Sequence, residues 1–300
     1  MTELVEPRAL PETAAQAPPR PGRHRLRALL RRPRLLVCGT LVMLVLLLAA
    51  FPSLFTRVDA HDPALCELRD ALAPPSAAHW FGTDALGCDY YAQVVHGAQA
   101  SVTIGLVVTG ATFLISMVIG ALVGYLGGWV DAIVSRLCDV MFGLPFILGA
   151  IVVLQLFDGR SVATVCLALT LFYWPSGVRY MRSAVMGVRS REYVQAARVL
   201  GGSNLFVVRS HVIPNSLTPL IVLKTIGLGG VIAAEASLTF IGAGLTPPSI
   251  SWGLQLAAAK LEISTHPHLL VFPSIFLSVT VLAFVLFGEA VRDALDPKTR

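Results

Sequence analysis

The chain has 300 residues, of which 55% are hydrophobic and only 14% are charged. A water-soluble domain carries about 25% charged residues, because a polar surface must cover its core. Together with a mean hydropathy of +0.72, this composition excludes an ordinary soluble protein. The net charge of +5 does not by itself indicate nucleic-acid binding, since its distribution along the chain decides its meaning. The five cysteines lack the paired CxxC spacing of a zinc ribbon, and we expect neither a metal site nor a nucleic-acid partner.

Six apolar segments are long enough to cross a bilayer as helices, which requires about 20 residues each. They are residues 35–55, 101–126, 132–157, 161–186, 215–245 and 269–291. Their continuous apolar character favours helices over the alternating pattern of a β-barrel. A helix also satisfies its own backbone hydrogen bonds in lipid. The sequence therefore predicts an all-α polytopic membrane protein with six spans.

The distribution of basic residues predicts the orientation of these spans. Residues 1–34 contain eight arginines, residues 179–210 contain six, and residues 292–300 add three basic side chains. With six spans these regions lie on one side of the membrane. Residues 56–100, on the other side, contain six acidic residues and two arginines. Because basic residues concentrate in cytoplasmic loops, we expect both termini to be cytoplasmic.

The chain then divides into parts in the order that these spans dictate. The predicted parts are a disordered basic N-terminus (1–34), a first span (35–55), an external segment (56–100), a core of five spans with a cytoplasmic loop at 187–214 (101–292), and a cytoplasmic tail (293–300). The basic N-terminus also matches a nucleic-acid-binding arm or the start of a cleaved secretory signal. Because five more spans follow, the sequence favours an uncleaved first span with a basic anchor.

Motifs for catalysis are missing from the sequence. A P-loop requires a lysine directly after a glycine-rich loop, and none of the three lysines follows a glycine. His266 and His268 could bind a metal, but two histidines at a loop-to-helix junction are more often ordinary surface residues. We therefore expect a chain that is not an enzyme and binds no cofactor.

The predicted cytoplasmic loop 187–214 has a helical pattern of its own. Small or apolar residues recur at helical spacing on one predicted face, at Val194, Ala197, Gly201 and Leu205. Gly201 and Gly202 would end a helix, and Pro214 limits where the next helix can begin. The pattern predicts a short helix, a glycine turn and a second short helix. The face lacks the bulky residues of a lipid-surface helix, which favours docking to another protein.

The run EYVQAARVLGGSNLFVVRSHVIPN, residues 192–215, resembles the EAA loop of bacterial ATP-binding-cassette (ABC) importer permeases. The chain departs from the family pattern at Gln195, His211 and Ile213, and Glu192 supplies an acid one turn before the usual position. Three further stretches are similar to the C-type permease subunit of dipeptide and oligopeptide importers. They are residues 79–105, 234–253 and 272–298.

The resemblance implies a six-helix type I importer permease in a bacterial inner membrane. It implies a second related permease, two ATPase domains that bind ATP and magnesium, an external lipoprotein that delivers the substrate, and a peptide substrate. The residues expected to couple this chain to the ATPases are Glu192, Tyr193, Gln195, Ala196, Ala197, Arg198, Gly201 and Pro214. Alternatives are the same architecture carrying nickel or another small solute, an ion-gradient-driven secondary transporter, and a membrane scaffold.

Glu235 is the most costly residue of the predicted spans, because an acid at the bilayer centre costs roughly 2.5–3.5 kcal/mol. Three roles stay open for Glu235: a border of the external mouth of the translocation pathway, a structural carboxylate that binds the loop 242–253, and direct contact with the substrate. Cys66 and Cys88 share the external segment, where oxidation is permitted, and we expect a disulfide between them.

Overall fold

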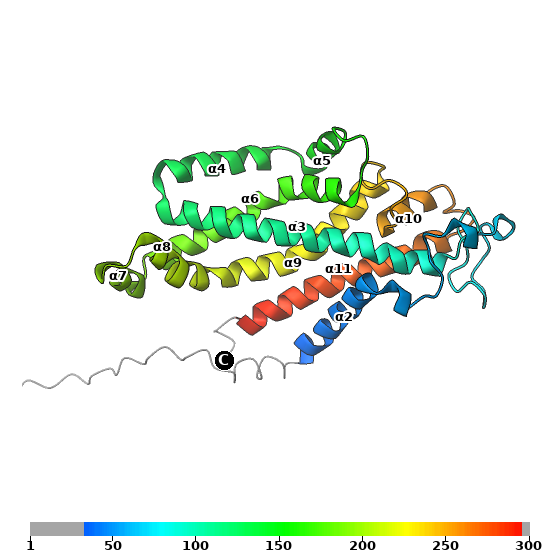
Figure 1. Ribbon diagram of the computed structural model, residues 1–300, viewed down its shortest axis with the longest axis horizontal. Coiled ribbons are helices and arrows are strands. Elements are labelled where there is room, and N and C mark those ends of the chain that lie inside the picture. Colours follow the sequence, from blue (N-terminus) through cyan, green and yellow to red (C-terminus); the bar gives the residue numbers. More distant parts are fainter. Residues whose placement is uncertain (1–32, 296–300) are drawn as a thin grey trace, which may run out of the picture.

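The computed structural model describes residues 33–295, so the predicted basic N-terminus, apart from its last two residues, and the end of the C-terminal tail lie outside the described residues. Within this range the regular structure is helical apart from one isolated bridge between Thr83 and Asp89. Long helices lie roughly along one axis (Figure 1). Among residues 33–295, five helices are long and apolar enough to cross a membrane singly, and a bent helix pair gives a sixth candidate.

The long helices agree with the predicted spans and differ at their ends. They are α2 (Pro33–Ala50), α3 (Tyr90–Leu126), α6 (Val162–Arg189), α9 (Ile213–Phe240) and α11 (His268–Leu295). Helix α3 is much longer than predicted and starts inside the expected external segment 56–100. Its start is set by the Asp89 side chain, which accepts a hydrogen bond of 2.8 Å from the backbone N–H of Ala92, because such caps satisfy the free amides of a first turn.

The third predicted span, residues 132–157, is two helices rather than one. Helix α4 (Gly128–Gly143) and helix α5 (Phe146–Leu154) meet at an angle of 92°. Leu144 between them is extended, with φ −82° and ψ 125°. Leu144 precedes Pro145, and a residue before proline is driven away from the helical conformation. The helix therefore breaks at Leu144, which the apolar character of the run does not reveal.

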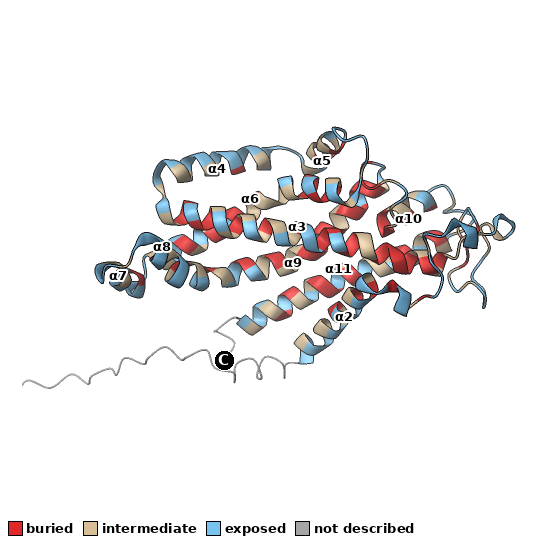
Figure 2. Cartoon of the chain, viewed as in Figure 1, coloured by how far each residue is buried: buried red, intermediate tan, exposed pale blue. Residues whose placement is uncertain are grey.

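Helix α3 is the centre of the bundle and packs mainly against α6 and α9. Gly120 and Gly124 allow α3 and α6 to approach closely. A Cβ at Gly120 would lie 2.6 Å from the Met181 Cβ, and one at Gly124 would lie 2.8 Å from the Arg182 carbonyl oxygen. Small residues four apart are typical of helix contacts in membranes, since they let two backbones meet. Buried residues line these contacts, and exposed ones cover the outer faces (Figure 2).

Ion pairs add to the contact between α4 and α6. Arg182 binds Asp131 through two hydrogen bonds of 2.5 and 2.6 Å. Arg179 binds Asp139 closely, whereas the intrahelical partner of Asp139, Arg136, lies 3.9 Å away. Asp139 therefore pairs chiefly with α6 and not with its own helix. The two ion pairs hold α4 against α6, although much of the surface of α4 is exposed.

The shorter helices lie at the two ends of the bundle. They are η1 (Pro52–Leu54), η2 (Pro63–Leu65), η3 (Leu68–Asp70) and α10 (Trp252–Ala259) at one end, and α7 (Glu192–Val199), α8 (Asn204–Val207) and the π-helical turn η4 (Val208–Val212) at the other. Figure 1 shows α7 and α8 far from the segment that joins α2 to α3. The predicted cytoplasmic loop and the predicted external segment therefore lie at opposite ends.

Candidate functional site

The segment 190–212 forms the short helix, glycine turn and second short helix that the sequence predicts. Helix α7 ends at Val199, and Gly201 follows with φ +87°, a conformation that favours glycine. The backbone N–H of Gly202 donates to the Ala197 carbonyl oxygen over 3.0 Å. The Ser203 side chain then caps α8 by accepting a 3.3 Å hydrogen bond from the Phe206 N–H. The turn is therefore closed by hydrogen bonds on both sides.

One face of this segment packs against the chain's own bundle. Val194 is fully buried and belongs to an apolar cluster with Val207 and with Met181 and Val185 of α6. Ala197 is partly buried against the same cluster. This corrects the predicted docking face, because Val194 and Ala197 anchor the helix to the bundle while Leu205 is 77% exposed. Helical spacing alone does not reveal which protein covers a face.

The outward face consists of other residues. Val199 and Leu200 are each 87% exposed at the tip of the segment, and Tyr193 and Phe206 are about half exposed. Most of the predicted coupling residues are also exposed, namely Glu192, Tyr193, Gln195, Ala196 and Gly201. We call this surface the α7 tip, defined by Glu192, Tyr193, Gln195, Ala196, Val199, Leu200, Gly201, Leu205 and Phe206. Val199, Leu200 and Phe206 were not predicted from the sequence, although their apolar character close to Gly201 and Gly202 was an available signal.

Polar contacts hold the α7 tip in place. The Arg189 guanidinium donates to the carbonyl oxygens of Gly124 and Tyr125 at the end of α3, over 3.0 and 3.1 Å. The Tyr125 hydroxyl donates to Asn204 Oδ1 over 2.9 Å. The Arg198 guanidinium lies 5.0 Å from the centre of the Tyr125 ring. Tyr125 therefore joins α3 to both α7 and α8, and Arg189 at the end of α6 joins that helix to α3.

The connection to α9 is continuous. The chain from Asn204 to Phe240 is helical throughout, with the π-helical turn η4 just before Pro214. A proline removes one backbone donor from a helix, and a π-turn is a common way to accommodate such a defect. Pro214 is exposed and stands in the first turn of α9, so it neither ends a helix nor belongs to the α7 tip.

Glu235 lies at the far end of α9 and is fully buried. Its carboxylate accepts hydrogen bonds from the hydroxyls of Thr239, Ser101 and Ser251, over 3.0, 3.1 and 3.4 Å. These donors belong to α9, to α3 and to the loop before α10. The carboxylate therefore joins α9 to α3 and to the loop 242–253, and its role in the translocation pathway stays a prediction.

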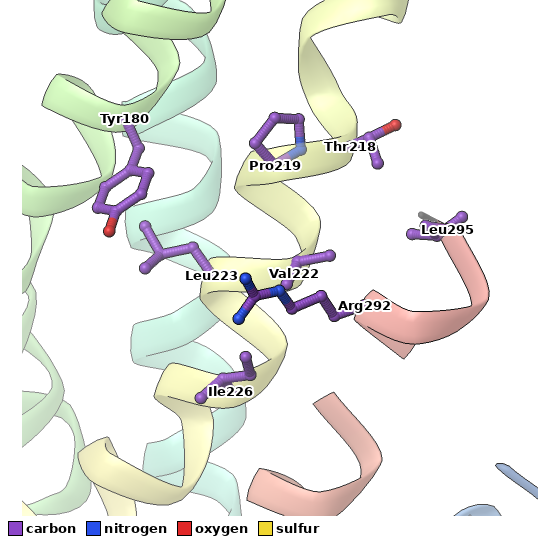
Figure 3. Close-up of a pocket in the computed structure, with 8 residues that line it drawn as sticks. All are labelled: Tyr180, Thr218, Pro219, Val222, Leu223, Ile226, Arg292 and Leu295. Carbon is purple, nitrogen blue, oxygen red and sulfur yellow. The ribbon is translucent and has the colours of Figure 1, made fainter. Parts of the chain in front are cut away.

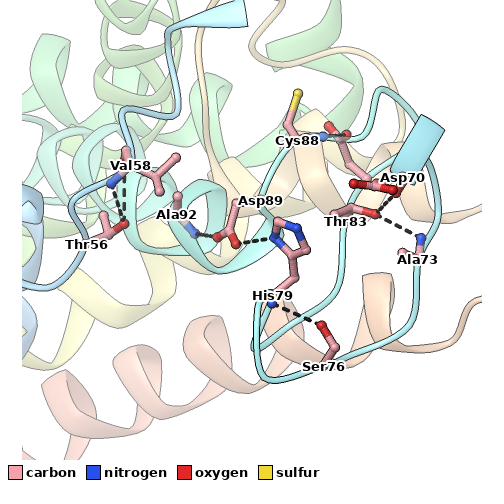
Figure 4. A network of polar contacts seen from close by, with 11 residues as sticks. Thr56, Val58, Asp70, Ala73, Ser76, His79, Thr83, Cys88, Asp89 and Ala92 are labelled. Carbon is pink, nitrogen blue, oxygen red and sulfur yellow. Dashed lines mark hydrogen bonds and ion pairs between the residues drawn. The ribbon is translucent and has the colours of Figure 1, made fainter. Parts of the chain in front are cut away.

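The segment 51–89 is held together by a compact polar network (Figure 4). The structure contains the expected disulfide between Cys66 and Cys88. The Ala73 N–H donates to the Thr83 hydroxyl over 2.9 Å, and His79 Nδ1 lies 2.9 Å from an Asp89 carboxylate oxygen. Because Asp89 also caps α3, the segment is fixed to the end of the bundle.

A cavity of about 420 Å³ lies between α6, α9 and α11. Apart from the Arg292 guanidinium and the Tyr180 and Thr218 side chains its lining is apolar, and Figure 3 shows these residues around it. The lining residues are Tyr180, Thr218, Pro219, Val222, Leu223, Ile226, Arg292 and Leu295. None of them belongs to α7 or α8, so this cavity is a feature of the bundle flank and separate from the α7 tip.

Comparison with known proteins identifies relatives over most of the chain. Residues 116–300 match the family described as binding-protein-dependent transport system inner membrane component. The dipeptide transport system permease protein DppC of Bacillus subtilis is 34% identical over 272 residues, covering 90% of this chain and 84% of that protein. The probable D,D-dipeptide transport system permease protein DdpC of Escherichia coli is 37% identical, covering 89% and 88%.

Two further matches extend this picture. The glutathione transport system permease protein GsiD of Pectobacterium atrosepticum is 33% identical over 280 residues, covering 93% of this chain and 92% of that protein. Among solved structures, the inward-facing MetNI methionine ABC transporter aligns with a TM-score of 0.55 and 19% identity, covering 68% of this chain and 97% of that chain. At this identity the structural match shows a shared fold.

Proposed function

We infer the function from the premise that the chain belongs to the family of binding-protein-dependent transport system inner membrane components, and we propose that its α7 tip is the site at which partner ATPases drive transport. The chain is a multi-pass permease of a bacterial inner membrane. Three similar permeases are named for the transport of dipeptides, D,D-dipeptides and glutathione. These names support a peptide as the transported substrate.

The observation that carries the proposal is the exposure of Val199 and Leu200, 87% each, on a segment that is otherwise anchored. Neighbouring apolar side chains held out together into solvent are typical of a surface that binds another protein, whereas a single exposed leucine is ordinary. The acid Glu192 and the amide Gln195 lie beside them and are exposed as well. A partner with an apolar groove and a polar rim fits this surface, in the manner of a helix bound in a groove.

The connections of the α7 tip support a mechanical role. A displacement of the tip moves α9 directly, because α8, η4 and α9 form one continuous helix. It moves α3 through the contacts of Asn204 and Arg198 with Tyr125, and it moves α6 through the buried Val194. Alternating access requires two global states that a partner biases, and a rigid lever of this kind couples a movement outside the membrane to the helices within it.

The remaining parts of the proposal follow from this role. ATP and magnesium are bound by two partner ATPase domains, and this chain is not catalytic. A second related permease completes the pathway, and an external binding protein delivers the peptide to the end formed by residues 51–89. The α7 end is cytoplasmic, which the six arginines of residues 179–210 support by the positive-inside rule.

The test is ATP-dependent peptide uptake by the permease reconstituted with its partners. We expect Leu200→Asp to reduce uptake at least tenfold, because it places a charge at the centre of the proposed interface. The matched control is Leu261→Asp, which changes an equally exposed leucine, 90% exposed, at the opposite end. Full uptake in the Leu200 variant would contradict the proposal, and a panel of dipeptides and glutathione tests the substrate class.

A further inference from the structure

Three potential metal ligands meet at the end of the bundle opposite the α7 tip. They are Asp59 and His61, in the segment after α2, and His96 on α3. One ligand atom from each residue lies within 4.8 Å of the other two. Asp59 Oδ1 and His61 Nδ1 are 3.4 Å apart, and the two imidazole rings face each other edge to face with centroids 5.6 Å apart.

His96 is already arranged as a metal-binding histidine. Its side chain is largely buried, with 8% of the residue exposed, and its Nδ1 lies 2.9 Å from the Ala92 carbonyl oxygen. Because a carbonyl only accepts hydrogen bonds, Nδ1 carries the proton and the lone pair is on Nε2. Histidine ligands of metals usually have this second contact, which fixes the tautomer and the ring orientation.

Asp59 and His61 have the freedom to complete the site. Their side chains are 65% and 51% exposed. The backbone N–H of His61 donates to Asp59 Oδ1 over 2.9 Å, which holds the two residues on one turn. Metal bonds of about 2.0–2.1 Å in a tetrahedron place ligand atoms roughly 3.4 Å apart. The Asp59–His61 pair has this spacing, and rotation of two exposed side chains brings the pair closer to His96.

The cluster opens on a cavity of about 480 Å³. Besides the two histidines, its lining includes the polar side chains of Gln99, Thr103 and Ser249. The cavity gives an ion a path from solvent and leaves room for a water at a fourth position. Three protein ligands and one open position are typical of zinc sites that retain exchangeable water.

We propose that Asp59, His61 and His96 bind a divalent transition metal ion of borderline softness, for which Zn²⁺ is the reference. Two imidazoles and one carboxylate suit zinc better than calcium or magnesium, which prefer oxygen ligands. The bound ion connects the segment after α2 to α3 beside the mouth of the cavity. The inference does not depend on the proposed transport function, because binding is measured without transport.

A second histidine cluster provides a matched control. His266 lies 3.1 Å from Glu262, and its ring centroid is 6.0 Å from that of His268. Within residues 33–295 only the Asp59 cluster brings three ligand atoms within binding distance of one another. Replacing His266 and His268 by asparagine therefore removes two histidines from the same end of the bundle without touching the proposed site.

The experiment is Zn²⁺ titration of the untagged full-length chain in detergent, with a chromogenic chelator as competitor. We expect one equivalent to bind, and we expect His96→Asn, His61→Asn and Asp59→Asn each to weaken binding about tenfold or more, as the loss of a ligand or its support does. The His266→Asn, His268→Asn double variant should bind like the wild type. Thermal unfolding of each variant without metal verifies that it is folded.

Co²⁺ in place of Zn²⁺ identifies the ligands independently. Visible bands of four-coordinate cobalt, without the near-ultraviolet band of a cobalt–thiolate bond, support the proposal and exclude the free cysteines as ligands. Three results would overturn it: no stoichiometric Zn²⁺ binding by the wild type, binding that survives His96→Asn in a folded variant, or equal weakening in the control. Asp59→Asn keeps the test decisive if His96→Asn fails to fold, because Asp59 is exposed.

Discussion

Replacing Glu235 separates a structural carboxylate from a residue of the pathway. Its carboxylate accepts hydrogen bonds from Ser101, Thr239 and Ser251 in a fully buried place. A hydrogen bond to a charged group contributes about 1.5–3 kcal/mol, and burying the charge offsets much of that sum. We expect Glu235→Ala to lower the free energy of unfolding by about 2–4 kcal/mol, because three hydroxyls lose their acceptor and a cavity remains.

Glu235→Gln is the informative companion, because glutamine keeps the volume and one acceptor oxygen. A serine hydroxyl can rotate and accept a hydrogen bond from the new amide, so we expect a loss of about 1–2 kcal/mol. The assay is equilibrium unfolding in mixed micelles for both variants. A double-mutant cycle with Ser101→Ala should give a coupling energy of about 1 kcal/mol, as expected for residues in one hydrogen-bond network.

Uptake measurements decide between a structural role of Glu235 and a role in the pathway. If it is structural, Glu235→Gln retains most of the uptake of the reconstituted transporter at temperatures where the variant is folded. The reasoning is refuted if Glu235→Ala unfolds like the wild type. It is refuted equally if Glu235→Gln abolishes uptake without changing stability, since that pattern belongs to a residue of the pathway.

Three other predictions concern the two ends of the bundle. Val194→Ala should cost about 2 kcal/mol in unfolding free energy, since two buried methyl groups are lost; an unchanged unfolding midpoint would mean that α7 is not anchored. Replacing Cys66 and Cys88 by serine should cost about 3 kcal/mol through the added freedom of the unfolded loop, and unchanged proteolysis of residues 66–88 would argue against this. A hydrogen bond from His266 holds the pKa of the Glu262 carboxyl below its ordinary value of 4.5. The stability that this hydrogen bond contributes is therefore present above pH 4.5 and is lost as the pH falls through the folded-state pKa. The hydrogen-exchange protection of residues 260–268, relative to the intrinsic rate at each pH, should fall in that acid range, and Glu262→Gln should remove the change.

The sequence predicted the elements that depend on local composition. Continuous apolar runs predicted the spans, and Gly201 and Gly202 predicted the turn after α7, because only a residue tolerant of positive φ fits there. It did not predict the 92° bend between α4 and α5. An apolar run containing proline can be a kinked span or a broken one, and only packing against α6 decides.

The functional residues were harder to predict where contacts are distant in sequence. The outward face of α7 and α8 was misassigned because Val194 and Leu205 both fit one apolar stripe. Packing against α6 buries Val194, whereas Leu205 stays exposed. The cluster of Asp59, His61 and His96 gave no sequence signal, since no metal motif has that spacing. Its ligands come together only because the segment after α2 folds back onto α3.

The most direct test of the central claim is photo-crosslinking in living cells from a benzophenone amino acid at position 200. The α7 tip is proposed to hold an ATPase, so Leu200 should crosslink to an ATP-hydrolysing protein, and the same probe at Leu261 should not. Leu261 is 90% exposed against 87% for Leu200, so exposure does not account for a difference. Capture of an ATPase from position 200 alone is the predicted result. Lack of capture from position 200, or equal capture from both positions, would contradict the account.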